Sequence, residues 1–119
     1  MSFLFRLFSS APKITMADAR TKVQQYIDSS PVVVFSKTYC PYCASTKSLL
    51  KSFGAKTTIL ELDQEADGSA MQDALQEISG QRTVPNIFIA QKHIGGNSEL
   101  QSLDKAGKLQ GLLKDAGAL

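Results

Sequence analysis

The spacing of hydrophobic residues changes several times along this chain, and each change predicts a different element. Between Thr15 and Ser30 the apolar positions recur at helical spacing, which predicts an amphipathic helix with Thr15 as its cap. Pro31 ends this pattern, and the apolar run 32–35 is β-branched and aromatic, which favours a strand covered on both faces. We therefore expect a helix followed by a buried strand.

The same alternation continues after a short polar turn. Helical spacing returns at about 43–53 and stops at Gly54, and the stretch 57–62 predicts the next strand. A strand, a helix and a strand in this order form a βαβ unit, in which the strands are parallel and the crossover is right-handed.

The second half of the chain has shorter elements. We expect a polar connection at 63–68, a helix at 69–79 ended by Gly80, strands at 86–90 and 92–94, and helices at 98–105 and 108–116 separated by Gly107. The two strands pair across a tight turn near Ala90 and Gln91, although neither residue is the Gly or Asn that usually eases such a turn. The whole pattern predicts an α/β fold with a central sheet of about four strands and helices on both faces.

The composition supports one domain and argues against several kinds of partner. The chain has 119 residues, of which 43% are hydrophobic, which is enough for one core. Its net charge of +2 comes from Arg6 and Lys13 near the start, so the rest is neutral and no nucleic-acid partner is expected. The two cysteines and the single histidine, His93, give no zinc-finger spacing, so no metal is expected.

Residues 1–15 have the composition of a leader, and residues 16–119 are expected to form the domain. The leader is apolar and basic, and Arg6 interrupts it where a secretory signal would be uninterrupted. It is too short to span a membrane, and no membrane partner is expected. A short mitochondrial presequence is the preferred interpretation, and a tail without targeting function is the alternative. A start at Met16 would omit the leader, so we expect a cytoplasmic protein with a further mitochondrial form.

Both cysteines lie in the segment Lys37–Cys43, between the first predicted strand and the following helix. Their C-x-x-C spacing beside a βαβ unit is typical of a redox pair that closes a small disulfide. The amides and the positive dipole end of the helix favour a thiolate, and Cys40, which precedes the helix, is the expected nucleophile. Cys43 is placed to attack a disulfide formed on Cys40. Half of a metal site completed by a second chain, or two inert buried cysteines, are the alternatives.

Residues around this pair offer possible ligand contacts. Lys37 is close enough to favour a thiolate or to bind an anionic ligand, and an ordinary solvated lysine is the alternative. We expect Tyr42 to pack beside a bound ligand, whereas Tyr39 is equally suited to the core.

Two later segments are also candidates for binding. If Pro85 in Thr83-Val84-Pro85 has a cis peptide bond, the backbone of Val84 faces outward and can pair with a peptide. From this tripeptide alone, an ordinary trans proline at the start of an edge strand is the preferred interpretation. In the segment Gly95–Glu99, glycines and a helix start could receive a carboxylate, or could serve only as a turn and cap.

Taken in order, the segments Lys37–Cys43, Arg82–Pro85 and Gly95–Ser98 resemble the motifs of a dithiol glutaredoxin of the C-P-Y-C type, in the thioredoxin superfamily. The resemblance covers about residues 17–119. It implies a thioredoxin-like fold with a central mixed sheet and a cis Pro85. It also implies a glutathione-dependent thiol-disulfide oxidoreductase that reduces protein-glutathione mixed disulfides and protein disulfides. Glutathione is then the reducing co-substrate, the partners are glutathionylated or disulfide-containing proteins, and a monomer is expected.

The resemblance also implies roles for individual residues. Cys40 and Cys43 would be catalytic and form the redox-active disulfide. Lys37 and Gln72 would hold the glycyl carboxylate of glutathione, with Arg82 nearby. The Val84 backbone would pair with the cysteinyl part, and Ser98 and Glu99 would meet the γ-glutamyl end. The full glutathione-binding set is Lys37, Tyr42, Gln72, Arg82, Thr83, Val84, Pro85, Gly96, Asn97, Ser98 and Glu99. Glu99 departs from the family, which usually has the shorter Asp at this position.

Two other functions share parts of this pattern. A thioredoxin served by a flavoprotein reductase would have the same fold and cysteine pair. It would not need the glutathione-binding residues Lys37 and Gln72 or the anion site at 96–98. A [2Fe-2S] cluster carrier would use Cys40 and glutathione between two chains. Pro41 counts against the carrier by resemblance, because cluster-binding relatives mostly have a small residue there.

Overall fold

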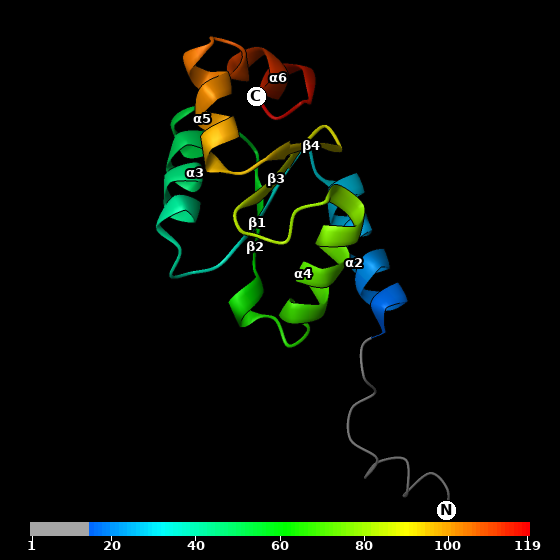
Figure 1. Cartoon of the computed structure of the whole chain (residues 1–119). Helices are drawn as coiled ribbons and strands as arrows, with labels where there is room; N and C mark the ends of the chain where they lie inside the picture. Colours follow the sequence, from blue (N-terminus) through cyan, green and yellow to red (C-terminus); the bar gives the residue numbers. More distant parts are fainter. Residues whose placement is uncertain (1–14) are drawn as a thin grey trace, which may run out of the picture.

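The computed structural model describes residues 15–119 and places a four-stranded sheet at their centre (Figure 1). The strands are β1 (Val32–Ser36), β2 (Thr58–Glu61), β3 (Asn86–Ile89) and β4 (Lys92–Gly95). The helices are α2 (Met16–Ser29), α3 (Pro41–Ser52), α4 (Gly68–Ser79), α5 (Asn97–Lys105) and α6 (Leu109–Asp115), with a 3-10 turn at Leu62–Gln64. The predicted leader, apart from Thr15, lies outside the described residues.

The sheet is mixed, and its strand order is β2-β1-β3-β4. Strand β1 is parallel to β2, as the βαβ unit predicts, and antiparallel to β3, which in turn pairs with β4 in the antiparallel sense. Every residue of β1 is buried. The continuous apolar run at 32–35 is thus explained, because β1 has a neighbour on each side and helices over both faces.

Side chains from alternate positions of β1 support two separate cores, one on each face of the sheet. Val33 and Phe35 pack with α2 and α4, whereas Val32 and Val34 pack with α3, α5 and α6. Figure 1 shows the same division, with α2 and α4 on one side of the strands and α3 and α5 on the other. The predicted α/β fold with helices on both faces is confirmed.

Several element boundaries differ from the sequence prediction for local reasons. Helix α3 begins at Pro41 rather than about residue 43, because a proline in the first turn has no amide that would need a partner. Strand β2 ends at Glu61, and Leu62 turns out of the sheet to bury its side chain in the core. Helix α4 begins at Gly68, where a Cβ would collide with the carbonyl of Leu62.

The predicted tight turn between β3 and β4 is confirmed. Ala90 and Gln91 have φ values of 51° and 68°, so both central residues occupy the left-handed region, as in a type I′ turn. This conformation costs about 1 kcal/mol or more for each residue that carries a Cβ. The turn is flanked by the antiparallel pairing of β3 with β4, in which Ile89 lies opposite Lys92, and by the buried strand β3.

The predicted cap of the first helix is also present, since the amide of Asp18 donates to Thr15 Oγ1 at 3.0 Å. Within residues 15–119, no helix is both long and apolar enough to cross a membrane.

Candidate active site

The sulfur of Cys40 sits at the start of α3 and accepts a hydrogen bond from the helix. Cys40 is the N-cap residue, and its Sγ accepts from the backbone amide of Cys43 at 3.3 Å. The thiol also lies 3.9 Å from the carbonyl oxygen of Val84, to which it can donate. Amide donation and the positive end of the helix both stabilise a negative sulfur. The strand-to-helix turn therefore places a partly exposed sulfur at the start of α3.

Cys43 has a different environment, although it is only three residues away. Its side chain is fully buried, and both cysteines are free thiols in this structure. Burial, followed by the hydrogen bond with the Cys40 thiol, raises the pKa of Cys43, and the nearby Ser36 hydroxyl acts in the opposite direction. An external disulfide can reach Cys40 but not Cys43, whose attack is restricted to a sulfur already attached to Cys40.

A cleft of about 300 Å³ opens beside Cys40. Its lining residues come from three segments that are far apart in the sequence: Tyr42, Thr83, Val84, Pro85, Gly96, Asn97, Ser98 and Glu99. The fold thus gathers eight of the eleven residues predicted to bind glutathione into one cleft. A larger hollow of about 610 Å³ lies elsewhere, but residues 22–29 of a single helix line it, so it is a surface depression away from the cysteines.

The segment 81–85 forms one wall of the cleft and is held by amide side chains. The Val84-Pro85 peptide bond is cis, as the resemblance implies. Gln81 Nε2 donates to the carbonyls of Thr83 and Pro85, both at 3.0 Å, and Gln72 Nε2 donates to the carbonyl of Arg82 at 3.0 Å. Within residues 15–119 the backbone of Val84 has no backbone hydrogen-bond partner. Its amide is consequently free to pair with an extended ligand, and its carbonyl has only the long contact from the Cys40 thiol.

The start of α5 forms the opposite wall, and Glu99 folds back onto it. Glu99 Oε1 accepts from the amide of Gly96 at 2.6 Å, and Oε2 accepts from the Ser98 hydroxyl at 3.0 Å. These bonds, the Gly96 amide first, lower the pKa of Glu99. Gly95 has a φ of 121°, and a Cβ there would lie 2.8 Å from Glu99 Oε1. The carboxylate thus lines the cleft while it caps its own helix.

The side chain of Asn97 connects the two helices that meet at the cleft. Asn97 Oδ1 accepts from the hydroxyl of the buried Thr46 in α3 at 3.0 Å and from Gln101 Nε2 at 3.3 Å. Asn97 therefore presents its backbone to the cleft and uses its side chain internally. Sequence reasoning missed both Thr46 and Gln81, because a single Thr or Gln inside a helix or loop gives no signal of its partner.

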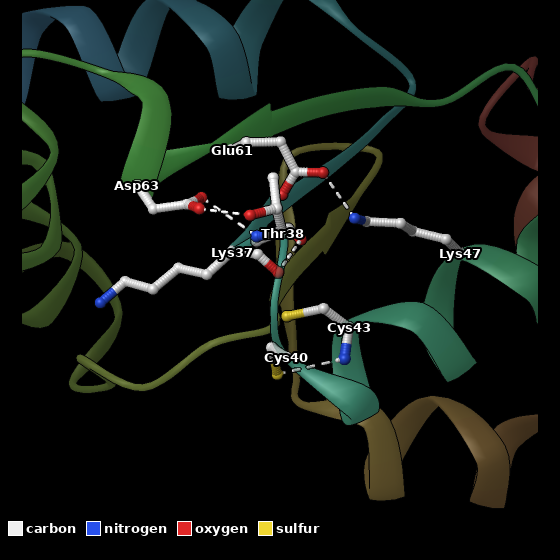
Figure 2. A network of polar contacts seen from close by, with 8 residues as sticks. Lys37, Thr38, Cys40, Cys43, Lys47, Glu61 and Asp63 are labelled. Carbon is white, nitrogen blue, oxygen red and sulfur yellow. Dashed lines mark hydrogen bonds and ion pairs between the residues drawn. The ribbon is translucent and has the colours of Figure 1, made fainter.

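The predicted cationic residues lie outside the cleft lining. Figure 2 shows the Lys37 side chain extending away from both sulfurs. Arg82 Nε is 2.9 Å from Asp73 Oδ1 and is well exposed. Gln72 is nearly buried beneath the segment that it supports. These three residues therefore do not line the cleft, and their contacts to a ligand remain predictions.

The turn that carries Lys37 and Tyr39 is fixed by Asp63. The amide of Thr38 donates to Asp63 Oδ1 at 3.0 Å, and its hydroxyl donates to Oδ2 (Figure 2). The hydroxyl bond is the main reason that the pKa of Asp63 is lowered, and Lys37 contributes a smaller attraction. Tyr39 is 71% exposed, so the alternative that placed it in the core is wrong.

An ion pair connects α3 to the edge strand β2. Lys47 Nζ lies 2.5 Å from Glu61 Oε2, and both side chains are partly buried (Figure 2). Lys47 is one helical turn beyond Cys43, so this ion pair anchors the helix that carries the buried thiol.

A C-x-x-C pair at the start of the helix that follows the first strand of a four-stranded mixed sheet defines the thioredoxin-like class of thiol-disulfide oxidoreductases. Comparisons with known proteins identify the family. The glutaredoxin family model matches residues 32–94. A glutaredoxin of Vernicia fordii is 54% identical over 101 residues, covering 85% of this chain and 97% of that protein. Glutaredoxin-C2 of Arabidopsis thaliana is also 54% identical over 101 residues, covering 85% of this chain and 91% of that protein.

A solved structure gives the same result in three dimensions. The crystal structure of a buckwheat glutaredoxin-glutathione complex has a TM-score of 0.87 and 47% sequence identity, and the match covers 92% of this chain and 99% of that one. The chain belongs to the glutaredoxin family. The predicted family and the thioredoxin-like fold are both confirmed.

Proposed function

We propose that this chain is a dithiol glutaredoxin of the C-P-Y-C type, which uses glutathione to reduce protein-glutathione mixed disulfides and protein disulfides. The observation that carries the proposal is the position of the Cys40 sulfur. It lies at a helix start, beside a cleft that offers the Val84 backbone, which has no backbone hydrogen-bond partner in the described residues, on one wall and helix amides on the other. The solved complex of the buckwheat relative supports glutathione as the ligand.

Each part of glutathione has a partner of suitable chemistry around this cleft. Its cysteinyl backbone pairs with Val84, which directs the ligand sulfur towards Cys40. The γ-glutamyl carboxylate accepts from the free amides at the start of α5, where the helix dipole favours an anion. The glycyl carboxylate extends towards Lys37 and Arg82 at the other end, with Gln72 supporting the carbonyl of Arg82.

With a glutathionylated protein, the reaction has two exchange steps. The Cys40 thiolate attacks the glutathione sulfur, the old disulfide breaks, and the protein thiolate leaves and takes a proton from water. The thiolate of a second glutathione then attacks the glutathione sulfur held on Cys40. This step releases oxidised glutathione and restores the Cys40 thiolate.

A protein disulfide requires both cysteines. The Cys40 thiolate attacks one substrate sulfur, the substrate disulfide breaks and releases its other sulfur as a thiolate, and Cys40 forms a mixed disulfide with the protein. Cys43 loses its proton and attacks the Cys40 sulfur, so the Cys40–Cys43 disulfide forms and the second protein thiolate leaves. Two glutathione molecules then reduce this disulfide in succession.

The test is glutathione-dependent reduction of a small mixed disulfide, such as the one between glutathione and cysteine. Oxidised glutathione is measured through NADPH consumption by glutathione reductase, with Cys40→Ser as the control. Turnover that requires Cys40 supports the proposal. Reduction that depends only on a flavoprotein thioredoxin reductase would identify a thioredoxin activity instead. A visible absorption spectrum after anaerobic iron and sulfide reconstitution, without mixed-disulfide turnover, would identify a cluster carrier.

We further propose that residues 1–15 direct part of the protein to mitochondria and that a start at Met16 gives a cytoplasmic form. Composition alone supports this proposal. A full-length fusion to a fluorescent protein should label both compartments, and the Met1→Leu variant should label the cytoplasm only. A full-length fusion found wholly in the cytoplasm would overturn the proposal. Monomeric behaviour is a separate expectation, and sedimentation equilibrium tests it.

A further inference from the structure

Two tyrosines beside the nucleophile are unusually exposed. Tyr39 and Tyr42 expose 71% and 68% of their surfaces, whereas Leu119, the next most exposed large hydrophobic residue in the described part of the chain, exposes 45%. Single exposed hydrophobic residues are common on protein surfaces, but two exposed aromatic residues that flank a reactive residue in the sequence indicate a binding surface. Tyrosine is also enriched where proteins bind one another, because its ring gives a large contact area with few rotatable bonds.

The two tyrosines are not equivalent. Tyr42 lines the cleft next to Cys40, and Tyr39 does not. The cleft volume of about 300 Å³ is at the small end of the range for ligand pockets, so it suits one tripeptide and leaves no room for a protein segment. Tyr39 therefore has no role in the proposed glutathione site, yet it directly precedes the nucleophile.

Tyr39 is also presented on a fixed turn. The amide of Cys40 donates to the carbonyl of Lys37 at 3.2 Å, and Asp63 holds the intervening Thr38 by both its amide and its hydroxyl. A ring on a rigid turn loses little conformational freedom when it is covered.

The chemistry of the reaction places the rest of the substrate at this rim. In a glutathionylated protein, the protein sulfur is about 2.05 Å from the glutathione sulfur that Cys40 attacks. The residues on either side of the modified cysteine must therefore lie against the surface around Cys40 that is outside the cleft. Tyr39 directly precedes Cys40 in the chain, is exposed and does not line the cleft.

We propose that Tyr39 is a docking residue for the protein part of glutathionylated substrates, and that it favours an apolar side chain next to the modified cysteine. This inference rests on the proposed glutathione-dependent activity. It assigns Tyr39 to substrate selection among proteins and leaves the binding of glutathione to the cleft. The proposed contact is made by the ring, because the favoured partner is an apolar side chain.

The test compares three substrates with the same reacting disulfide. These are a glutathionylated peptide with leucines flanking the cysteine, the same peptide with glycines, and the mixed disulfide of glutathione and cysteine. For Tyr39→Ser, we expect kcat/KM to fall about tenfold with the leucine peptide and by less than about twofold with the other two. Tyr39→Phe should behave like the wild type. Leu112→Ala, which removes an exposed hydrophobic residue far along the chain in α6, controls for general surface effects.

The outcomes separate this inference from the function on which it rests. An equal fall with all three substrates would show that Tyr39 acts on the thiol or its turn, and no change with any substrate would show that it does not dock proteins. Either result overturns the inference while the activity stands. Failure of the wild type with the glutathione-cysteine disulfide would instead overturn the proposed function itself.

Discussion

Helices α3 and α5 both begin just after a strand, both start at the same cleft, and they pack against each other. Their first turns are nevertheless capped in opposite ways. At α3 the capping atom is the Cys40 sulfur, which accepts the amide of Cys43. At α5 the N-cap is Gly96, which has no side chain, and the carboxylate of Glu99 reaches back from inside the helix to accept its amide.

This difference separates the reactive end of the site from the binding end. The partial positive charge of α3 acts on an atom that changes its charge during the reaction. The partial positive charge at the start of α5 is partly balanced by the carboxylate of Glu99, which does not change during the reaction. A ligand carboxylate at α5 must therefore use the remaining amides, and it experiences a weaker field than an uncapped helix would give.

The largest expected effect comes from replacing the capping sulfur of α3. Cys40→Ser should abolish reduction of both glutathionylated proteins and protein disulfides, because no other described thiol is exposed. Cys43→Ser should retain reduction of glutathionylated proteins and lose reduction of protein disulfides, because only the latter needs the second sulfur. Steady-state assays with each substrate class test this division. Loss of the first activity in Cys43→Ser would contradict it.

The cap of α5 can be displaced without touching the reactive sulfur. In Gly95→Ala, the new Cβ would meet Glu99 Oε1, and the φ of 121° is unfavourable for any residue with a side chain. We expect a loss of about 1–3 kcal/mol in the free energy of unfolding, measured by urea titration. Gly111→Ala in α6 is the matched control, because a Cβ there has open space. It should be neutral or stabilising by up to about 1 kcal/mol. Equal effects of the two substitutions would exclude the proposed clash.

The bond between the two helices should affect ligand binding more than catalysis. Thr46→Val keeps the shape of the side chain but removes the hydrogen bond to Asn97, so the start of α5 can shift relative to α3. We expect a loss of about 1–2 kcal/mol in stability, a raised KM for glutathione, and little change in kcat. Thr46→Ser keeps the hydroxyl and should restore the KM. A fall in kcat alone would indicate that Thr46 acts on the cysteines instead.

The smallest effect concerns the charge on Glu99. Its pKa is lower in the folded protein than in the unfolded chain, so its carboxylate adds stability above the unfolded value of about 4.3. This contribution is lost as the pH falls through the folded pKa. The wild type should therefore be more stable than Glu99→Gln at pH 7, and the difference should be smaller at pH 3, below the unfolded pKa. The comparison uses urea unfolding at both pH values, and a difference independent of pH would contradict the assigned cause.

The sequence was most informative where one residue type implies one local structure. The apolar run at 32–35 predicted the buried strand, and the C-x-x-C pair predicted a thiol at a helix start. Gly80 predicted the end of α4, where its φ of 79° is the left-handed conformation that glycine adopts easily. Each of these signals depends only on neighbouring residues in the sequence, so it can be recognised without knowing which distant residue makes a contact in the fold.

Features that depend on a distant partner could not be predicted in the same way. The bond from Thr46 to Asn97 joins residues 51 positions apart, and the pattern of α3 alone shows only a small residue on a buried face. The substitution of Glu for Asp at residue 99 was visible, but its consequence depended on the conformation of Gly95 and Gly96. The direction of Lys37 likewise followed from the turn that Asp63 fixes, which the sequence does not display.

The central claim is that the exposed Cys40 sulfur attacks the glutathione side of the substrate disulfide. The direct measurement is mass spectrometry of the Cys43→Ser variant after brief exposure to a glutathionylated protein, with unreacted thiols alkylated. We predict one glutathione attached to Cys40 and the substrate protein released with a free thiol. A covalent complex between Cys40 and the substrate protein as the main product would contradict the claim.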